Sequence, residues 1–135
     1  MTIDAGSVAA WLDRYVEAWK SYDRGQIEAL FSPEVEYRYH PYDEPIVGRD
    51  EVVRSWLGES ADDAASERDR PGTYEASYRP VAVDGEVAVA VGTSSYRDEP
   101  GGEVVEIYEN CFLIRFGDDG RCVAFTEWYM KRPAP

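Results

Sequence analysis

The sequence predicts an α+β fold, because its helical and strand patterns fall into separate parts of the chain. Three helical segments and one strand are expected within residues 8–57, and four further strands within residues 74–130. Helices followed by a meander of antiparallel strands are typical of this class. All 135 residues are expected to form one domain, residues 1–135, which is long enough to bury a core.

The first helix is expected over residues 8–21, with Ser7 as its N-cap. Apolar residues recur at steps of four, three and four, which places them on one face. That face consists of Val8, Leu12, Tyr15 and Trp19. A helix with such a face is expected to pack against the sheet.

Two shorter helices are expected before the meander. Asp23 and Gln26 resemble a capping box, and Ser32-Pro33 is expected to end the helix that they begin. The third helix is expected over residues 50–57, with Asp50 as its N-cap. Residues 59–72 are polar and acidic, so we interpret most of them as a surface connection, in which the helix could continue through residues 61–65. A lid over a cavity is the alternative.

A strand over residues 35–40 carries much of the aromatic character of the N-terminal half. Val35, Tyr37 and Tyr39 alternate on one face, and His40 lies on the other face if the strand is regular. Pro41 ends the strand because it cannot donate to the ladder. His40 could turn inward beside this proline.

The meander is expected to contain strands over residues 74–83, 86–96, 104–116 and 121–130. Asp84-Gly85 predicts a tight hairpin, with Val83 opposite Glu86 and Tyr78 opposite Val91. Residues 117–120, GDDG, join the last two strands. A simple register pairs Phe116 with Arg121 and therefore Phe112 with Phe125, Asn110 with Glu127 and Tyr108 with Tyr129. A one-residue bulge would instead turn Thr126 and Trp128 to this face.

One face of the last hairpin changes from apolar near its turn to polar and aromatic farther away, as expected for a cavity with a few polar groups. The candidate ligand-binding residues are Tyr15, Trp19, Tyr39, Tyr108, Asn110 and Tyr129. The candidate catalytic residues are Glu127, His40 and Tyr37. Burial would raise the pKa of Glu127, which suits general acid–base catalysis, and Tyr37 or Tyr39 could donate to a developing enolate oxygen.

Composition disfavours several classes of partner. The net charge of −13 would repel nucleic acid and anionic membrane surfaces. No signal peptide and no apolar run approaching ~20 residues is expected. Cys111 and Cys122 lie too far apart in the predicted register for a disulfide, so we expect reduced thiols in a cytoplasmic protein. A single histidine and no cofactor motif indicate neither a metal site nor a cofactor.

Three segments resemble the nuclear transport factor 2-like superfamily, which includes SnoaL-like polyketide cyclases, ketosteroid isomerases, scytalone dehydratases and limonene epoxide hydrolases. They are YVEAWKSYDRGQIEALFSPEVEY, PIVGRDEV and FGDDGRCVAFTEWYM. The resemblance implies a cone-shaped α+β barrel with three N-terminal helices packed in a curved, mostly antiparallel sheet. It also implies that aromatic residues of the first helix reach the pocket. Tyr39 stands where epoxide hydrolases of this fold carry an asparagine, which disfavours that reaction.

Three functions remain open at this point. The first is a cofactor-independent isomerase, cyclase, dehydratase or hydrolase that transfers protons on a small hydrophobic compound. The second is a module that binds such a compound without turnover. The third is an interaction domain, and for any of them we expect a homodimer formed through the outer sheet face, where Ile107, Cys111, Leu113 and Trp128 lie.

Overall fold

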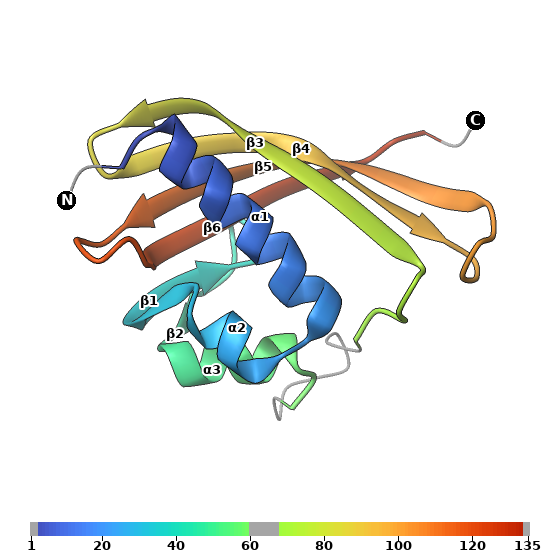
Figure 1. The fold of residues 1–135 in the computed structure, drawn as a ribbon, viewed down its shortest axis with the longest axis horizontal. Helices are drawn as coiled ribbons and strands as arrows, with labels where there is room; N and C mark the ends of the chain where they lie inside the picture. Colours follow the sequence, from blue (N-terminus) through green and yellow to red (C-terminus); the bar gives the residue numbers. More distant parts are fainter. Residues whose placement is uncertain (1–2, 60–67, 134–135) are drawn as a thin grey trace.

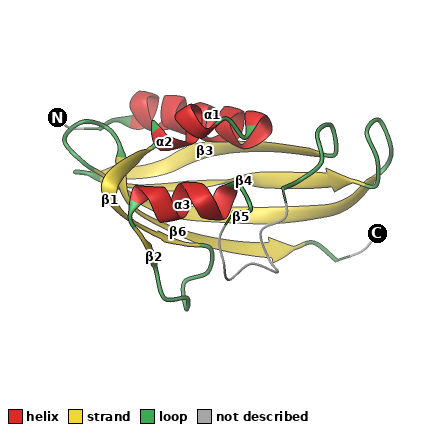
Figure 2. Cartoon of the chain, turned by 90° about the horizontal axis from the view of Figure 1, so that it is seen from below, coloured by secondary structure: helices red, strands yellow, loops and turns green. Residues whose placement is uncertain are grey.

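The computed structural model describes residues 3–59 and 68–133, and in this part of the chain three helices pack against one face of a curved six-stranded sheet (Figures 1 and 2). The helices are α1 (Ala5–Ser21), α2 (Arg24–Glu28) and α3 (Arg49–Trp56). The strands are β1 (Phe31–Arg38), β2 (Ile46–Val47), β3 (Tyr74–Asp84), β4 (Val87–Arg97), β5 (Val104–Phe116) and β6 (Cys122–Lys131). The predicted class, α+β with three N-terminal helices and a mostly antiparallel sheet, is confirmed.

The sheet has the strand order β2-β1-β6-β5-β4-β3. All neighbouring pairs are antiparallel except β1 and β6, which run parallel. The short strand β2 pairs with the end of β1 and was not predicted. Since β1 and β6 are neighbours, side chains from the first and last long strands reach the same cavity.

The first helix begins earlier than predicted. Asp4, not Ser7, is the N-cap: its carboxylate accepts from the Ser7 backbone N–H at 2.7 Å, and the Ser7 hydroxyl accepts from the Asp4 N–H at 3.0 Å. Ser7 therefore completes a capping box as the third helical residue. The buried face of α1 contains Val8, Trp11, Leu12, Tyr15 and Ala18, and Trp19 is partly buried beside it.

The junction between α2 and β1 also differs from the prediction. The helix ends at Glu28, and Phe31, Ser32 and Pro33 belong to β1, which ends at Arg38. Pro33 is tolerated because it lies in the stretch where the β1–β6 register is irregular, between Phe31 and Glu36. A missing N–H removes no ladder hydrogen bond there.

The third helix is capped by a glycine rather than by Asp50. Gly48 has φ 95°, a conformation that side-chain-bearing residues rarely adopt, and it makes no side-chain cap. Asp50 and Glu51 lie in the first turn of the helix, where negative charge is favourable.

The β3–β4 hairpin turns one residue later than predicted. Asp84 pairs with Val87, so the loop residues are Gly85 and Glu86, and Val83 faces Ala88. Gly85 has φ 61°, a positive value that glycine adopts readily and that the first loop position of a two-residue hairpin requires. The small face of β4, with Ala88 and Ala90, is the buried one.

The β5–β6 register is shifted by two residues from the prediction. Phe116 pairs with Cys122, an irregularity follows, and Ile114 then pairs with Phe125. Phe112 therefore lies opposite Glu127, and Asn110 opposite Tyr129. A shift of two preserves the alternation of faces, so Glu127 and Tyr129 stay on the inner face although the predicted partners were wrong.

The remaining expectations are settled in part. Cys111 and Cys122 are free thiols, as their predicted separation required. No helix in the described ranges is long and apolar enough to cross a membrane. The predicted continuation of α3 through residues 61–65 lies outside the described residues.

Candidate functional site

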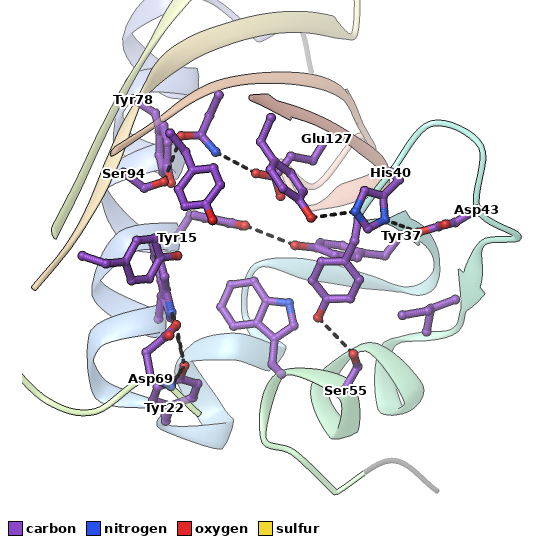
Figure 3. Close-up of a pocket in the computed structure, with 18 of the residues that line it drawn as sticks. Tyr15, Tyr22, Tyr37, His40, Asp43, Ser55, Asp69, Tyr78, Ser94 and Glu127 are labelled. Atoms are coloured by element: carbon purple, nitrogen blue, oxygen red, sulfur yellow. Dashed lines mark hydrogen bonds and ion pairs between the residues drawn. The ribbon is translucent and has the colours of Figure 1, made fainter. Parts of the chain in front are cut away.

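An open cavity of about 850 Å³ lies between α1, α3 and the inner face of the sheet (Figure 3). Every candidate residue predicted from the sequence lines this cavity, whatever its role. They are Tyr15, Trp19, Tyr37, Tyr39, His40, Tyr108, Asn110, Glu127 and Tyr129. The catalytic and binding roles assigned to them stay predictions.

Glu127 is held by a short chain of polar side chains on β4, β5 and β6. The Asn110 amide donates from Nδ2 to Glu127 Oε2 at 2.8 Å, and the Ser94 hydroxyl donates to Asn110 Oδ1 at 3.0 Å. Asn110 and Ser94 are buried. The Asn110 amide is therefore hydrogen-bonded on both sides, through its oxygen to Ser94 and through its NH2 to the carboxyl. Asn110 and Glu127 meet diagonally, because their strands pair Asn110 with Tyr129.

Burial raises the pKa of Glu127 from its ordinary value of 4.5 to about 7. Desolvation is the largest cause, because removing the carboxylate from water disfavours its charged form. The Asn110 hydrogen bond and the charge of His40 act in the opposite direction and lower this pKa. A carboxyl with a pKa near neutrality is suited to both accepting and returning a proton.

His40 joins the cavity through a network that the sequence only partly predicted. Because β1 ends at Arg38, the alternation of the strand does not fix the direction of His40. Its Nε2 lies 2.7 Å from the Tyr129 hydroxyl, and its Nδ1 lies 2.8 Å from Asp43 Oδ2. Asp43 was not predicted as a site residue. Its backbone N–H donates to the His40 carbonyl in a turn, and its spacing of three residues from His40 was the available signal in the sequence.

Two buried tyrosine hydroxyls lie deep in the cavity. Tyr15 Oη and Tyr37 Oη are 3.1 Å apart, and the Tyr37 ring stacks on Phe125 at 4.6 Å. Burial raises the pKa of both phenols, and the charge of Glu127 raises both further, so both remain protonated donors. The indole N–H of Trp56 lies near the Tyr37 hydroxyl but makes no well-formed hydrogen bond in the described part of the chain.

Tyr39 makes a hydrogen bond to a different element, α3. Its hydroxyl lies 2.9 Å from Ser55 Oγ on α3, although its ring contacts Tyr37. Of the two tyrosines proposed as oxygen donors, Tyr37 is therefore the one whose hydroxyl lies with Tyr15 and in the field of Glu127.

A second carboxyl of the cavity, the half-buried Asp69, was missed. Asp69 Oδ2 accepts from Trp19 Nε1 at 3.0 Å and from the Tyr22 hydroxyl at 3.4 Å. The Tyr22 hydroxyl in turn accepts from the Asp69 backbone N–H at 2.9 Å. Burial raises the pKa of Asp69. The sequence around it, SERDRPG, offers no pattern that would have placed it in a cavity.

The cavity combines a titratable carboxyl with phenol groups and aromatic walls. Within residues 3–59 and 68–133, no three His, Cys, Asp or Glu side chains are placed to hold a metal ion. The cavity instead offers a carboxyl that titrates near neutrality, phenol donors and aromatic walls, which suit a small hydrophobic molecule.

Comparison with known proteins places the chain in a family. The model of the SnoaL-like domain matches residues 12–125. The chain belongs to the SnoaL-like domain family. No protein of curated function matches the sequence.

Solved structures share the fold of this SnoaL-like protein at low sequence identity. A protein provisionally assigned as a ketosteroid isomerase, from Kribbella flavida DSM 17836, has a TM-score of 0.65 at 18% identity, over 98% of this chain and 84% of its own. An LEH-like epoxide hydrolase from M. tuberculosis has a TM-score of 0.61 at 13% identity, over 93% and 84%. An NTF-2 like protein of unknown function from Burkholderia xenovorans LB400 has a TM-score of 0.64 at 15% identity, over 96% and 88%. These similarities confirm the NTF2-like fold that the sequence indicated.

Proposed function

We propose that this SnoaL-like protein is a cofactor-independent enzyme that transfers a proton on a small hydrophobic carbonyl compound. The observation that supports it most is Glu127, a desolvated carboxyl whose pKa is about 7 and which is fixed by Asn110 in an open cavity. The family and its structural relatives, which include a provisional isomerase and an epoxide hydrolase, are compatible with such chemistry.

In the proposed step, the Glu127 carboxylate removes a proton from the carbon next to the carbonyl. The C–H electron pair forms the carbon–carbon double bond of an enolate, and the carbonyl pair moves to oxygen. In this proposal the Tyr37 hydroxyl and the Trp56 N–H donate to this oxygen, since both groups are buried and line the cavity. Glu127 then returns its proton to the same carbon, which gives exchange, or, where the enolate is conjugated with a further double bond, to the far carbon of that system, which gives isomerisation.

His40 is the alternative acid–base group. It would act through the Tyr129 hydroxyl, because its Nε2 is already hydrogen-bonded to that group and its Nδ1 to Asp43. That both ring nitrogens have partners within the protein favours an orienting role for His40.

A second candidate function is ligand binding without turnover. It is favoured by the same observation on His40, together with the hydrogen bond that Asn110 already donates to Glu127. In that case the polar groups of the cavity serve to orient a bound molecule, and no proton leaves it.

Hydrogen–deuterium exchange on 2-tetralone tests the enzyme proposal, because this bicyclic ketone has an acidic C–H beside its carbonyl and fits an aromatic cavity. We expect the protein to accelerate exchange, followed by proton NMR in D2O. Glu127→Gln should reduce the rate about a hundredfold or more, and Tyr37→Phe about tenfold to a hundredfold. Glu99→Gln, an exposed carboxylate in the β4–β5 turn, is the matched control.

The outcome separates the two functions. Equal rates for wild type and Glu127→Gln, at equal protein concentration, would refute Glu127 as the proton acceptor. If wild type binds 2-tetralone by calorimetry but exchange proceeds at the buffer rate, the binding module is the better description.

We also propose that the protein forms a homodimer through the outer face of β5 and β6. Leu113 and Trp128 are each 42% exposed there, and Cys111 is the cross-strand partner of Trp128. Exposed apolar side chains grouped on one sheet face favour contact with a second copy. Leu113→Arg should convert a dimer to a monomer in sedimentation velocity, whereas Val81→Arg, on the edge strand β3, should not. A wild-type protein that sediments as a monomer at all concentrations would contradict this.

A further inference from the structure

The cavity has an uneven distribution of charge. Its described lining contains four carboxylates, Asp43, Asp69, Glu106 and Glu127, and no lysine or arginine. His40 is the basic group among the lining residues. A ligand with a carboxylate or phosphate would therefore meet like charges, and no guanidinium or ammonium group, among the described lining residues. The Arg68 guanidinium is not part of the lining and lies over the Tyr22 ring, 5.4 Å from its centroid.

Two of these carboxylates already have a basic partner. Asp43 lies 2.8 Å from His40, and Glu106 lies 3.6 Å from Lys131 and accepts from the Tyr108 hydroxyl. Asp69 and Glu127 make no ion pair with any described residue, and both are buried enough for desolvation to act on them. Burial raises the pKa of Tyr96, and the charges of Asp69 and Glu127 raise it further, so both carboxyls act on the Tyr96 hydroxyl.

Aromatic rings form a continuous arc along the cavity wall. Trp19 contacts Tyr96 at 6.3 Å, Tyr96 contacts Tyr108 at 5.8 Å, and Tyr108 contacts Tyr129 at 5.6 Å between ring centroids. Tyr129 then contacts His40 at 5.2 Å. Ring faces attract positive charge, so this wall and the carboxylates favour the same kind of ligand.

Asp69 is the carboxylate best placed to bind a cation. Its Oδ2 accepts both side-chain hydrogen bonds, from Trp19 and from Tyr22, and its Oδ1 makes none to a described residue. The Trp19 bond fixes the carboxyl against an indole that belongs to the aromatic arc. An ammonium group beside Oδ1 would meet a carboxylate and π faces together, which is the arrangement used to recognise organic cations.

We propose that the cavity binds a hydrophobic organic cation, a protonated amine or quaternary ammonium, with its positive group between Asp69 and the faces of Trp19 and Tyr96. This inference deepens the proposed function and rests on it for the reaction. The amine would lie at the Asp69 end, and the carbon that exchanges its proton at the Glu127 end. The substrate class is therefore a hydrophobic amino ketone. A bare metal ion does not fit, because the described residues hold no cluster of metal ligands and aromatic faces are poor ligands for one.

Three probes of equal shape and different charge test this inference: 2-aminotetralin, which is a cation at pH 8, neutral 2-tetralol and anionic tetralin-2-carboxylate. Binding is measured by isothermal calorimetry. We expect the amine to bind roughly tenfold tighter than the alcohol, and the carboxylate to bind weakest.

Variants assign the charge preference to a residue. Asp69→Asn should bind the amine no tighter than the alcohol, while its unchanged affinity for the alcohol shows that it is folded. Tyr96→Phe should keep the preference because it keeps the ring face, and Tyr96→Leu should reduce it. The matched control is Asp118→Asn, an exposed aspartate in the β5–β6 turn, which should behave as wild type.

Several results would overturn the inference. Wild type that binds amine and alcohol equally, binds the carboxylate best, or binds no amine at its solubility limit would each refute it. If Glu127→Gln removes the preference and Asp69→Asn does not, the assignment to Asp69 is wrong. A protein that exchanges 2-tetralone but does not prefer the amine keeps the proposed function and loses this inference. A protein that prefers the amine but exchanges no proton loses the catalytic proposal and keeps the binding site.

Discussion

Replacing Glu127 by glutamine should make the protein more stable at alkaline pH, because ionised Glu127 is poorly solvated in the folded state and lowers its stability. The pKa of Glu127 is raised from 4.5 to about 7 in the folded chain. Between these values the unfolded chain ionises while the folded chain keeps its proton. The folded state therefore binds more protons, and its stability falls as pH rises through this window.

The size of the effect follows from the same two values. At 1.36 kcal/mol for each unit of pKa, the full cost of ionising Glu127 in the folded state is about 3 kcal/mol, and it is reached above pH 7. Below about pH 4.5 both states are protonated and the cost vanishes. Glutamine keeps the size of the side chain and can still accept from Asn110, but it never ionises.

Urea unfolding of wild type and Glu127→Gln at several pH values between 5 and 9 measures this difference. We expect the variant to be more stable by less than ~1 kcal/mol at pH 5, and by ~1–3 kcal/mol at pH 8.5. Other groups that titrate are common to both proteins, so the difference isolates Glu127. The difference in free energy of unfolding between wild type and the Glu99→Gln control should not change with pH. A Glu127→Gln protein that is no more stable than wild type at pH 8.5, or gains stability only at acidic pH, would refute the reasoning.

Three further predictions follow from the site and the sheet. The value of kcat/KM for 2-tetralone exchange should rise with pH, with a midpoint near pH 7 and a plateau at higher pH, because Glu127 acts as a base only when ionised; a profile flat from pH 5 to 8 would contradict this. His40→Gln should move the midpoint of that profile to higher pH, since the charge of His40 lowers the pKa of Glu127; a midpoint unchanged or moved to lower pH would argue against the interaction. Gly92→Ala should cost ~3 kcal/mol or more in urea unfolding, because its Cβ would collide with the backbone oxygen of Ser77. Gly6→Ala, in the first turn of α1 with nothing nearer than 3.5 Å, should cost nothing and serves as its control.

The faces of the strands were predictable, whereas their partners were not. Alternation placed Glu127 and Tyr129 on one face of their strand. They stayed on the same face as Asn110 because the true register differs from the predicted one by two residues, an even number. The exact register depends on how the β5–β6 turn closes and on the irregularity between Phe116 and Arg115. The position of a bulge depends on the packing around it and has no characteristic residue pattern, so the sequence could not locate it.

The long helix shows why periodic segments are the most predictable. Val8, Leu12 and Tyr15 are buried as their spacing predicted. Its start was wrong by three residues because both Asp4 and Ser7 are good caps, and the two share one capping box.

The two unpredicted carboxyls of the site, Asp43 and Asp69, were missed for different reasons. Asp43 lies in a turn three residues after His40, so this contact is local and its spacing is visible in the sequence. Asp69 reaches Trp19 and Tyr22 from 47 to 50 residues away, in a segment whose composition is that of an ordinary surface loop. Contacts of that kind depend on the path of the chain after α3, which no local pattern specifies.

The position of β6 has a consequence for the order in which the molecule assembles. It follows every other strand in the sequence, yet it lies in the middle of the sheet, between β1 and β5. Until it docks, β1 has only the two-residue strand β2 as a partner, and the meander ends at β5. Pairing of such distant segments closes a long loop and is slow compared with helix or hairpin formation. Folding intermediates without β6 lack Glu127 and Tyr129, so during refolding the ability to bind ligand should appear in the last kinetic phase, after most secondary structure has formed.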